Sequence, residues 1–152
     1  MIRLINKLEK KIKNPNKGLP EDFFKFITRV TPMINVDLLI VNSKSEILLT
    51  WRNKGEKYKP GWHVPGGIIR YKEKIHQRIK KVAKKELGVS IYLEKKPIEI
   101  NEIFLNQKNR AHFISILYLC RLKSKLLKLQ KFKSGNPVVG NWKWHKSVPR
   151  NF

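Results

Sequence analysis

Residues 62–89 read WHVPGGIIRYKEKIHQRIKKVAKKELGV, and this stretch decides the fold. It opens with a short apolar run that ends at Pro65-Gly66-Gly67, a tripeptide typical of a break in regular structure. Between Glu73 and Leu87, apolar residues recur at three- and four-residue intervals: Ile75, Ile79, Val82 and either Ala83 or Leu87. This spacing predicts a helix with one buried face, and Gly88 stands where a helix terminator belongs. We therefore expect a loop, a helix and a second loop.

The same stretch carries the groups of a metal site. Glycine lets the backbone approach a cation closely, and Glu86 presents a carboxylate from the last turn of the predicted helix. Hard divalent cations such as Mg²⁺ prefer oxygen ligands and accept few protein ligands plus water. Positions 82, 85 and 86 share one helical face, so three carboxylates there would gather more than one cation. Because Val82 and Lys85 occupy two of these positions, we expect one metal site at most.

The spacing of Gly67, Glu73, Lys81, Glu86 and Gly88 resembles that of the Nudix box, with Lys81 at the position of the box arginine. It is most similar to the GDP-mannose mannosyl hydrolase branch, which also lacks two box carboxylates and keeps the last one. The likeness runs through further residues in the same order: Thr31-Pro32, Asp37, Leu48-Leu49, Arg52-Asn53, Trp62-His63-Val64-Pro65, His112-Phe113 and Trp142-Lys143-Trp144.

This resemblance implies an α/β fold, a mixed β-sheet sandwiched between helices, over residues 20–152. It also implies that the Gly66 carbonyl and Glu86 bind Mg²⁺, or alternatively Mn²⁺, beside a diphosphate. Arg52 would contact phosphate, and Asp37 would contact the sugar or the base. In that branch water substitutes at the anomeric carbon of the sugar, and the metal stabilises charge on the departing nucleoside diphosphate.

Two departures from the branch concern its chemistry. The family has a metal-binding glutamine and a catalytic histidine in the loop before its last strand, where this chain has Pro137-Val138-Val139-Gly140. Neither group can be carried over. The arginine after the paired glycines is replaced by Ile68, and we expect Arg70, two residues on, to project from the same strand face. His112 is a further candidate for substrate binding, with a core histidine as the alternative.

Several of these residues also have structural explanations. Glu73 can pair with Lys81 or begin the helix instead of touching a metal, and Arg52 can be an ordinary surface cation. Asp37 interrupts an apolar run, so a buried carboxylate there needs a partner from the protein or from the substrate. His63 and His145 are candidates for the site, but the sequence assigns no general base.

Composition limits the classes of protein. A chain of 152 residues has the size of one domain, and its single cysteine, Cys120, lies in an apolar run and predicts a buried thiol in a reducing, cytoplasmic compartment. No apolar run approaches the roughly 20 residues that span a bilayer, so we expect no membrane partner. The 34 Lys and Arg against 11 Asp and Glu give a charge of +23, which attracts phosphate-bearing ligands. Because the lysines are scattered through every segment, we do not expect a nucleic-acid surface.

Outside the central stretch, the pattern predicts two N-terminal helices followed by strands. Residues 1–19 are expected to form a basic amphipathic helix (residues 2–13) and a linker. The helix would pack on the domain or on a dimer partner, with a membrane-surface helix as the alternative. Together with the family resemblance, it favours a homodimer. A second helix begins after Pro20. Strands are expected over residues 34–41 and 46–51, joined as a hairpin, and over residues 89–93, 98–105, 112–122 and 141–145.

The leading hypothesis is a Mg²⁺-dependent hydrolase of a nucleoside-diphosphate-linked substrate, foremost a sugar nucleotide such as GDP-mannose. Attack at phosphorus, as by a nucleoside di- or triphosphate pyrophosphohydrolase, is an alternative. Another is a nucleotide-binding relative with weak or no turnover, because the loop Gln and His are missing. A role in nucleic-acid binding rests on charge alone.

Overall fold

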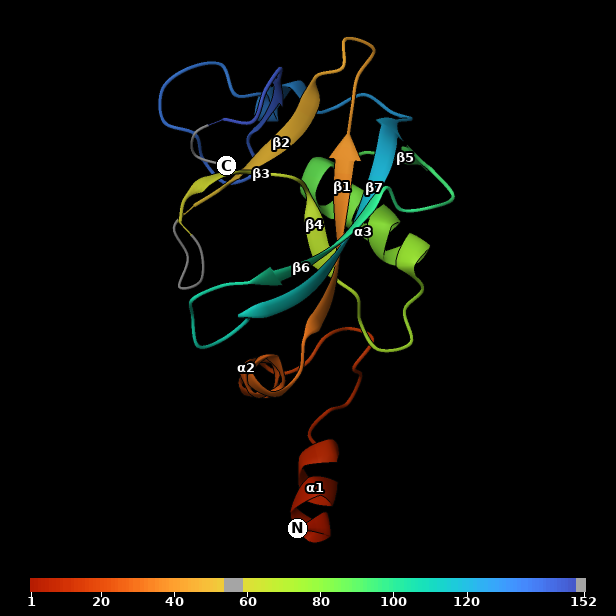
Figure 1. Cartoon of the computed structure of the whole chain (residues 1–152), viewed down its shortest axis with the longest axis vertical. Helices are drawn as coiled ribbons and strands as arrows, with labels where there is room; N and C mark the ends of the chain where they lie inside the picture. Colours follow the sequence, from red (N-terminus) through yellow and green to blue (C-terminus); the bar gives the residue numbers. More distant parts are fainter. Residues whose placement is uncertain (54–58, 150–152) are drawn as a thin grey trace.

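The computed structural model describes residues 1–53 and 59–149, which form two β-sheets and the helices around them, with one helix standing apart at the N-terminus (Figure 1). In chain order the elements are α1 (Ile2–Glu9), α2 (Glu21–Val30), β1 (Met33–Ile40), β2 (Ile47–Arg52), β3 (Gly61–His63), β4 (Gly66–Ile68), α3 (Ile75–Leu87), β5 (Ile91–Leu93), β6 (Glu99–Phe104), β7 (His112–Leu122), the 3₁₀ turn η1 (Lys128–Gln130) and β8 (Trp142–His145).

The larger sheet is mixed, as predicted. Its strands run in the order β4-β1-β7-β5, and β6 pairs with the first half of β7. Strands β1 and β7 are parallel, while the other pairs are antiparallel. The smaller sheet, β3-β2-β8, is antiparallel throughout. The expected α/β architecture is therefore confirmed.

The core lies between α3 and one face of β1. Alternate residues of a strand point to opposite faces, so β1 divides into two sets. Val36, Leu38 and Ile40 are each 0% exposed and pack with the buried face of α3, which consists of Ile79, Val82, Ala83 and Leu87. Asn35, Asp37 and Leu39 belong to the other face, so the polar positions of β1 point away from the core.

The predicted helix in residues 73–87 is confirmed, and its ends have clear causes. It begins at Ile75, where the side chain of Gln77 accepts a hydrogen bond from the backbone N–H of Lys74. It ends at Gly88, whose φ of 68° lies in the left-handed region that glycine adopts without strain. Cys120, on β7, is 1% exposed, and burial raises its pKa to about 12, which confirms the expected buried thiol.

The hairpin expected between β1 and β2 is wrong. The two strands belong to different sheets and share a single antiparallel bridge, Val41 to Ile47. Both edges of β1 are already occupied, one by β4 and the other by β7. The turn between the strands still closes as expected, because the side chain of Asn42 accepts hydrogen bonds from the N–H groups of Lys44 and Glu46.

The break expected at Pro65-Gly66-Gly67 falls at Val64 and Pro65, between β3 and β4, and both glycines belong to β4. They are required by close packing. A Cβ on Gly66 would lie 2.1 Å from Oδ1 of Asp37, and a Cβ on Gly67 would lie 2.9 Å from Cγ2 of Val82. Only residues without a side chain allow β4 to lie this close to β1 and α3.

Helix α1 stands apart from the rest of the molecule at the N-terminal end (Figure 1). None of its residues is buried, and its apolar side chains Ile2, Leu4, Ile5 and Leu8 are between 38% and 66% exposed. The helix is shorter than the predicted range of residues 2–13. No helix in the described ranges is long and apolar enough to cross a membrane.

The contact between Gly67 and Val82 gives a test of the fold. We expect Gly67→Ala to lower the free energy of unfolding by about 1–3 kcal/mol, because its methyl group overlaps the Val82 side chain. Val82→Ala opens a cavity and is also destabilising, but it makes room for the new methyl group. Urea unfolding should show that the double variant loses less free energy of unfolding than the two single variants lose in total. Additive losses would contradict the packing described here.

Candidate functional site

The pairing of β4 with β1 turns the backbone of Gly66 outward. The N–H of Leu38 donates to the carbonyl of Pro65 at 2.9 Å, and hydrogen-bonded and non-hydrogen-bonded pairs alternate along an antiparallel ladder. Asp37 and Gly66, the next pair, are therefore a non-hydrogen-bonded pair. The N–H and carbonyl of Gly66 both point away from β1, and the N–H donates to the carboxylate of Glu86.

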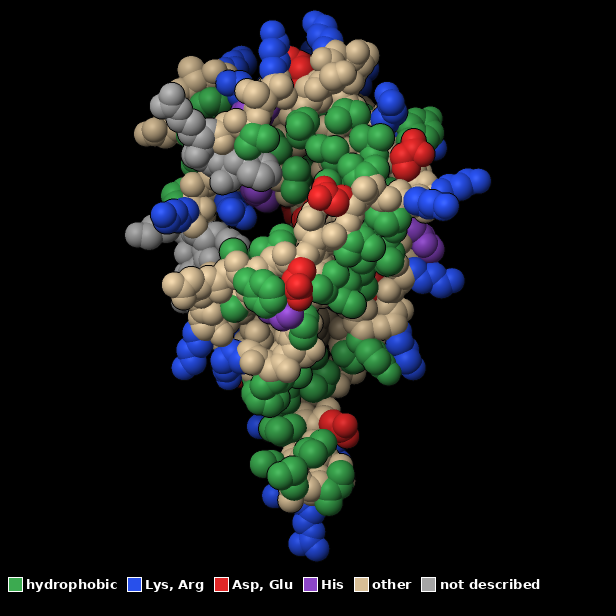
Figure 2. All heavy atoms as spheres, viewed as in Figure 1, with side chains coloured by type: hydrophobic (Ala, Val, Ile, Leu, Met, Phe, Trp, Pro, Cys, Tyr) green, Lys and Arg blue, Asp and Glu red, His purple; other side chains and the backbone are tan. Residues whose placement is uncertain are grey.

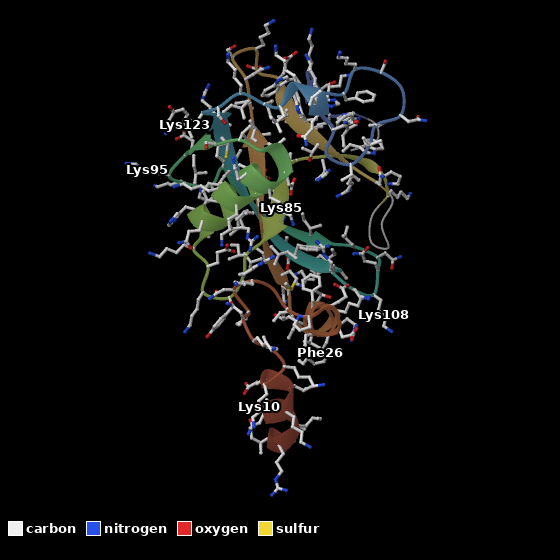
Figure 3. The ribbon with its side chains drawn as sticks, turned by 180° about the vertical axis from the view of Figure 1, so that it is seen from behind. Lys10, Phe26, Lys85, Lys95, Lys108 and Lys123 are labelled. Atoms are coloured by element: carbon white, nitrogen blue, oxygen red, sulfur yellow. The ribbon has the colours of Figure 1, made fainter. Side chains whose placement is uncertain are left out.

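Glu86 is a largely buried carboxylate on the last turn of α3. Burial raises its pKa from 4.5 to about 7, against the hydrogen bond from Gly66 and the charge of Lys85, and nearby Asp37 raises it further. Lys85, which precedes Glu86 on the last turn of α3, is labelled in the view from behind (Figure 3). The structure thus brings together the two residues predicted to bind metal, Gly66 and Glu86.

Asp37 has the protein partners that its burial requires. The amide of Asn35 donates to its Oδ1 at 2.8 Å, and the hydroxyl of Ser115 donates to its Oδ2. Burial raises the pKa of Asp37, and these two hydrogen bonds partly oppose the shift. Each carboxylate oxygen has a second lone pair, so the group can accept a further hydrogen bond.

Two cavities meet at the paired glycines. One, of about 440 Å³, is lined by Asn35, Asp37, Arg52, His63 and Ser115 among others. The second, of about 850 Å³, is lined by Glu86, several basic residues of α3, and Leu19, Phe24 and Tyr71. Gly66, Gly67 and Arg110 line both. The space-filling view shows a hollow between the β2–β3 region and β6 (Figure 2).

Arg52 and His63 come from the smaller sheet. Both line the 440 Å³ cavity with Asp37, so the predicted phosphate and sugar contacts, Arg52 and Asp37, share one cavity. Burial lowers the pKa of His63 to about 4, and the charge of Arg52 lowers it further, so the imidazole is neutral near pH 7.

A family model described as NUDIX domain matches residues 31–146. The chain belongs to the Nudix family. It is 31% identical to the low-salt glycan biosynthesis protein Agl8 of Haloferax volcanii over 80 residues, which are 53% of this chain and 50% of that protein. The chain thus spans about half the length of this curated relative.

Solved Nudix structures share the fold. A MutT protein from Methanosarcina mazei Go1 matches with a TM-score of 0.59 and 19% identity, covering 80% of this chain and 88% of that one. A NUDIX hydrolase from Nitrosomonas europaea matches with a TM-score of 0.57 and 16% identity, covering 76% and 72%. A UDP-X diphosphatase matches with a TM-score of 0.56 and 17% identity, covering 95% and 78%. At these identities the likeness concerns the fold alone.

Within the Nudix box, Glu73 is bound by cations of the protein. Its side chain is 3% exposed and pairs with Arg78 at 2.6 Å and Lys81 at 2.8 Å, and it accepts a hydrogen bond from the N–H of Arg70 at 3.1 Å. Burial raises the pKa of Glu73, but the hydrogen bonds from Lys81, Arg70 and Arg78 together hold it below its usual value. Glu73 therefore ties the loop after β4 to α3, which is the structural role that the sequence left open.

Arg70 and His112 lie differently from the other predicted site residues. Arg70 lines the 850 Å³ cavity with Glu86, and its guanidinium donates to the carbonyl of Lys17. Alternate residues of β7 point to opposite faces of the sheet. Ser115 is on the face of Asp37, to which it donates a hydrogen bond, and His112, three residues earlier, is on the other face. Its ring pairs with Glu102 at 3.0 Å and stacks on Phe104 with centroids 4.3 Å apart. The structure does not bring His112 to the cavities at Gly66.

The segment that lacks the family's Gln and His stays away from the cavities. None of residues 137–140 lines the 440 or the 850 Å³ cavity, and Val138 and Val139 are 59% and 66% exposed. His145 lines a third cavity, of about 280 Å³, together with Asp37. Burial and then the charge of Lys143 lower the pKa of His145, and its ring lies 4.9 Å from that of Trp62.

Three residues of the site were missed by the sequence reasoning. Asn35 and Ser115 hold Asp37, and both carried a signal: Asn35 shares a strand face with Asp37, and Ser115 interrupts an apolar run. Arg110 carried no local signal, because its position depends on segments distant in the sequence. Among the described residues there is no cluster of three or more His, Cys, Asp or Glu side chains that could hold a metal. A cation here would depend on Glu86 together with backbone, water or substrate oxygens.

The raised pKa of Glu86 predicts a pH dependence of stability. In the metal-free protein the folded state keeps a proton that the unfolded state releases between pH 4.5 and about 7, so stability falls as pH rises through this window. The loss attributable to Glu86 should be on the order of 3 kcal/mol, from a pKa that rises from 4.5 to about 7. Urea unfolding in EDTA should show this loss for the wild type relative to Glu86→Gln, which cannot ionise. Parallel pH profiles for the two proteins would contradict the assignment.

Proposed function

We propose that the chain is a divalent-metal-dependent hydrolase of nucleoside-diphosphate-linked substrates, foremost of a sugar nucleotide such as GDP-mannose. One observation carries the proposal. The carboxylate of Glu86 and the outward backbone groups of Gly66 meet where two cavities join, and Asp37 and Arg52 line one of these cavities.

The residues at this junction fit a hard cation. The carbonyl of Gly66 points to the same side of β4 as its N–H, which is bound to Glu86, so two oxygen donors lie on one side of the strand. Mg²⁺ commonly uses one or two carboxylates and completes its shell with water and substrate phosphate oxygens. A bound cation would also favour the ionised form of Glu86. Mg²⁺ is the first candidate and Mn²⁺ the second; either would stabilise charge on a departing diphosphate.

The other residues of the site would contact different parts of the substrate. Arg52 is suited to a phosphate oxygen, since a guanidinium matches phosphate geometry. Asp37 accepts hydrogen bonds from Asn35 and Ser115 and keeps lone pairs with which it would accept another from a hydroxyl of the sugar or from the base. Arg70 adds positive charge to the larger cavity. We leave His112 out of this assignment because it lies on the opposite face of the sheet.

Support for a sugar nucleotide comes from two sources. The resemblance to the GDP-mannose mannosyl hydrolase branch includes its reduced set of box carboxylates, and the Haloferax relative is named for glycan biosynthesis. The exposed segment at residues 137–140 favours a second candidate, a Nudix protein that binds such nucleotides with little turnover, because no group there replaces the family's Gln and His.

Product analysis separates these functions. We expect the protein, incubated with Mg²⁺ and a panel of GDP-, UDP- and ADP-sugars, to release free sugar and nucleoside diphosphate. In heavy-oxygen water the label should enter the sugar, because water attacks the anomeric carbon. Sugar phosphate with nucleoside monophosphate would show attack at phosphorus. Binding without turnover would favour the second candidate.

Glu86→Gln tests the metal assignment. We expect kcat to fall by at least about a hundredfold, with weaker Mg²⁺ activation, because the substitution removes a charged oxygen ligand. Glu94→Gln is the matched control, since Glu94 is exposed and lines none of the three cavities. Circular dichroism should show both variants folded. Unchanged activity in Glu86→Gln would remove Glu86 from the metal site.

A further inference from the structure

We infer that Arg110 is a further phosphate-binding residue, holding the diphosphate of the substrate where the two cavities meet. The inference rests on the proposed function, because it assigns a contact within the same site. Neither the Nudix box nor the family likeness includes Arg110.

Arg110 lies where the two cavities meet. Among the described residues, only Gly66, Gly67 and Arg110 line both the 440 and the 850 Å³ cavity. Glu86 lines the larger cavity and Asp37 the smaller one, so the acidic groups of the site lie on either side of this boundary. A diphosphate bound beside Gly66 and Glu86 occupies the boundary, and its two substituents extend into different cavities. Among the described arginines, Arg110 is the one that lines both cavities.

The side chain of Arg110 is held by aromatic rings. Its guanidinium carbon lies 5.8 Å from the ring centre of Phe24, on α2, and 5.7 Å from that of Phe113, on β7. Contacts of this kind restrict a guanidinium while leaving it cationic. A guanidinium also carries five N–H donors in a fixed plane that matches the oxygens of a phosphate group. The rings therefore position a group whose chemistry suits a diphosphate.

The backbone around Arg110 is fixed as well. Its φ is 54°, a left-handed conformation that a residue with a side chain seldom adopts and that persists where neighbouring structure enforces it. The side chain of Gln107 donates to its carbonyl at 2.8 Å, and Arg29 of α2 donates to the side chain of Asn109 at 2.9 Å. Figure 3 shows α2, labelled at Phe26, next to the β6–β7 loop, labelled at Lys108. Helix α2 thus orients the loop that carries the cation.

Arg110→Gln and Arg110→Lys test the inference through equilibrium binding. Titration calorimetry with GDP and with inorganic pyrophosphate, in the presence of Mg²⁺, should show an increase in Kd of about tenfold or more for Arg110→Gln. Arg110→Lys keeps the charge and should recover part of the affinity. The increase should appear with pyrophosphate as well as with GDP, because the contact is to phosphate and not to the base.

Lys108→Gln is the matched control. It removes an exposed cation from the same loop that lines neither cavity, so the Kd for both probes should stay close to that of the wild type. Wild-type affinity in Arg110→Gln, or an equal loss in Lys108→Gln, would overturn the role of Arg110 and leave the proposed function intact. A wild-type protein that binds neither probe and turns over no nucleotide sugar would overturn both.

Discussion

The non-hydrogen-bonded pairing of Asp37 with Gly66 is the constraint on which the site depends. It turns the N–H and carbonyl of Gly66 away from β1, so that one of them binds Glu86 and the other faces the same side. It also places Oδ1 of Asp37 where a side chain on residue 66 would lie, which leaves room for glycine alone. A shift of one residue in the register of β4 on β1 would separate Asp37, Gly66 and Glu86.

The charges of the site follow from burial within a strongly basic chain. Burial raises the pKa of both Glu86 and Asp37, and the charge of Asp37 raises the pKa of Glu86 further. Two such carboxylates favour a cation beside them. Glu73 has the opposite environment, since Arg78 and Lys81 already neutralise it. The net charge of +23 concentrates anionic ligands around the molecule, whereas the few buried carboxylates would select where a metal binds under the proposed function.

The sequence predicted those parts of the structure that depend on local spacing. The α3 helix, its end at Gly88 and the proximity of Gly66 to Glu86 follow from periodicity and from the family resemblance. The hairpin after β1 was wrong because pairing is decided by strands distant in the sequence, here β4 and β7. His112 was expected near the site but lies on the opposite face of the sheet from Asp37. The face on which a β7 residue lies relative to Asp37 depends on the register of β7 with β1, which the sequence does not show. Arg110 was missed because Phe24 and Phe113, which hold it, lie in separate elements.

The central claim is that one divalent cation binds between Glu86 and the Gly66 carbonyl. A crystal of the protein soaked in Mn²⁺, measured near the manganese absorption edge, tests it directly through anomalous scattering. The account predicts one strong anomalous peak per chain, in contact with the Glu86 carboxylate and the Gly66 carbonyl oxygen, and no such peak in Glu86→Gln. A peak at Glu73, or a peak elsewhere that persists in Glu86→Gln, would contradict it.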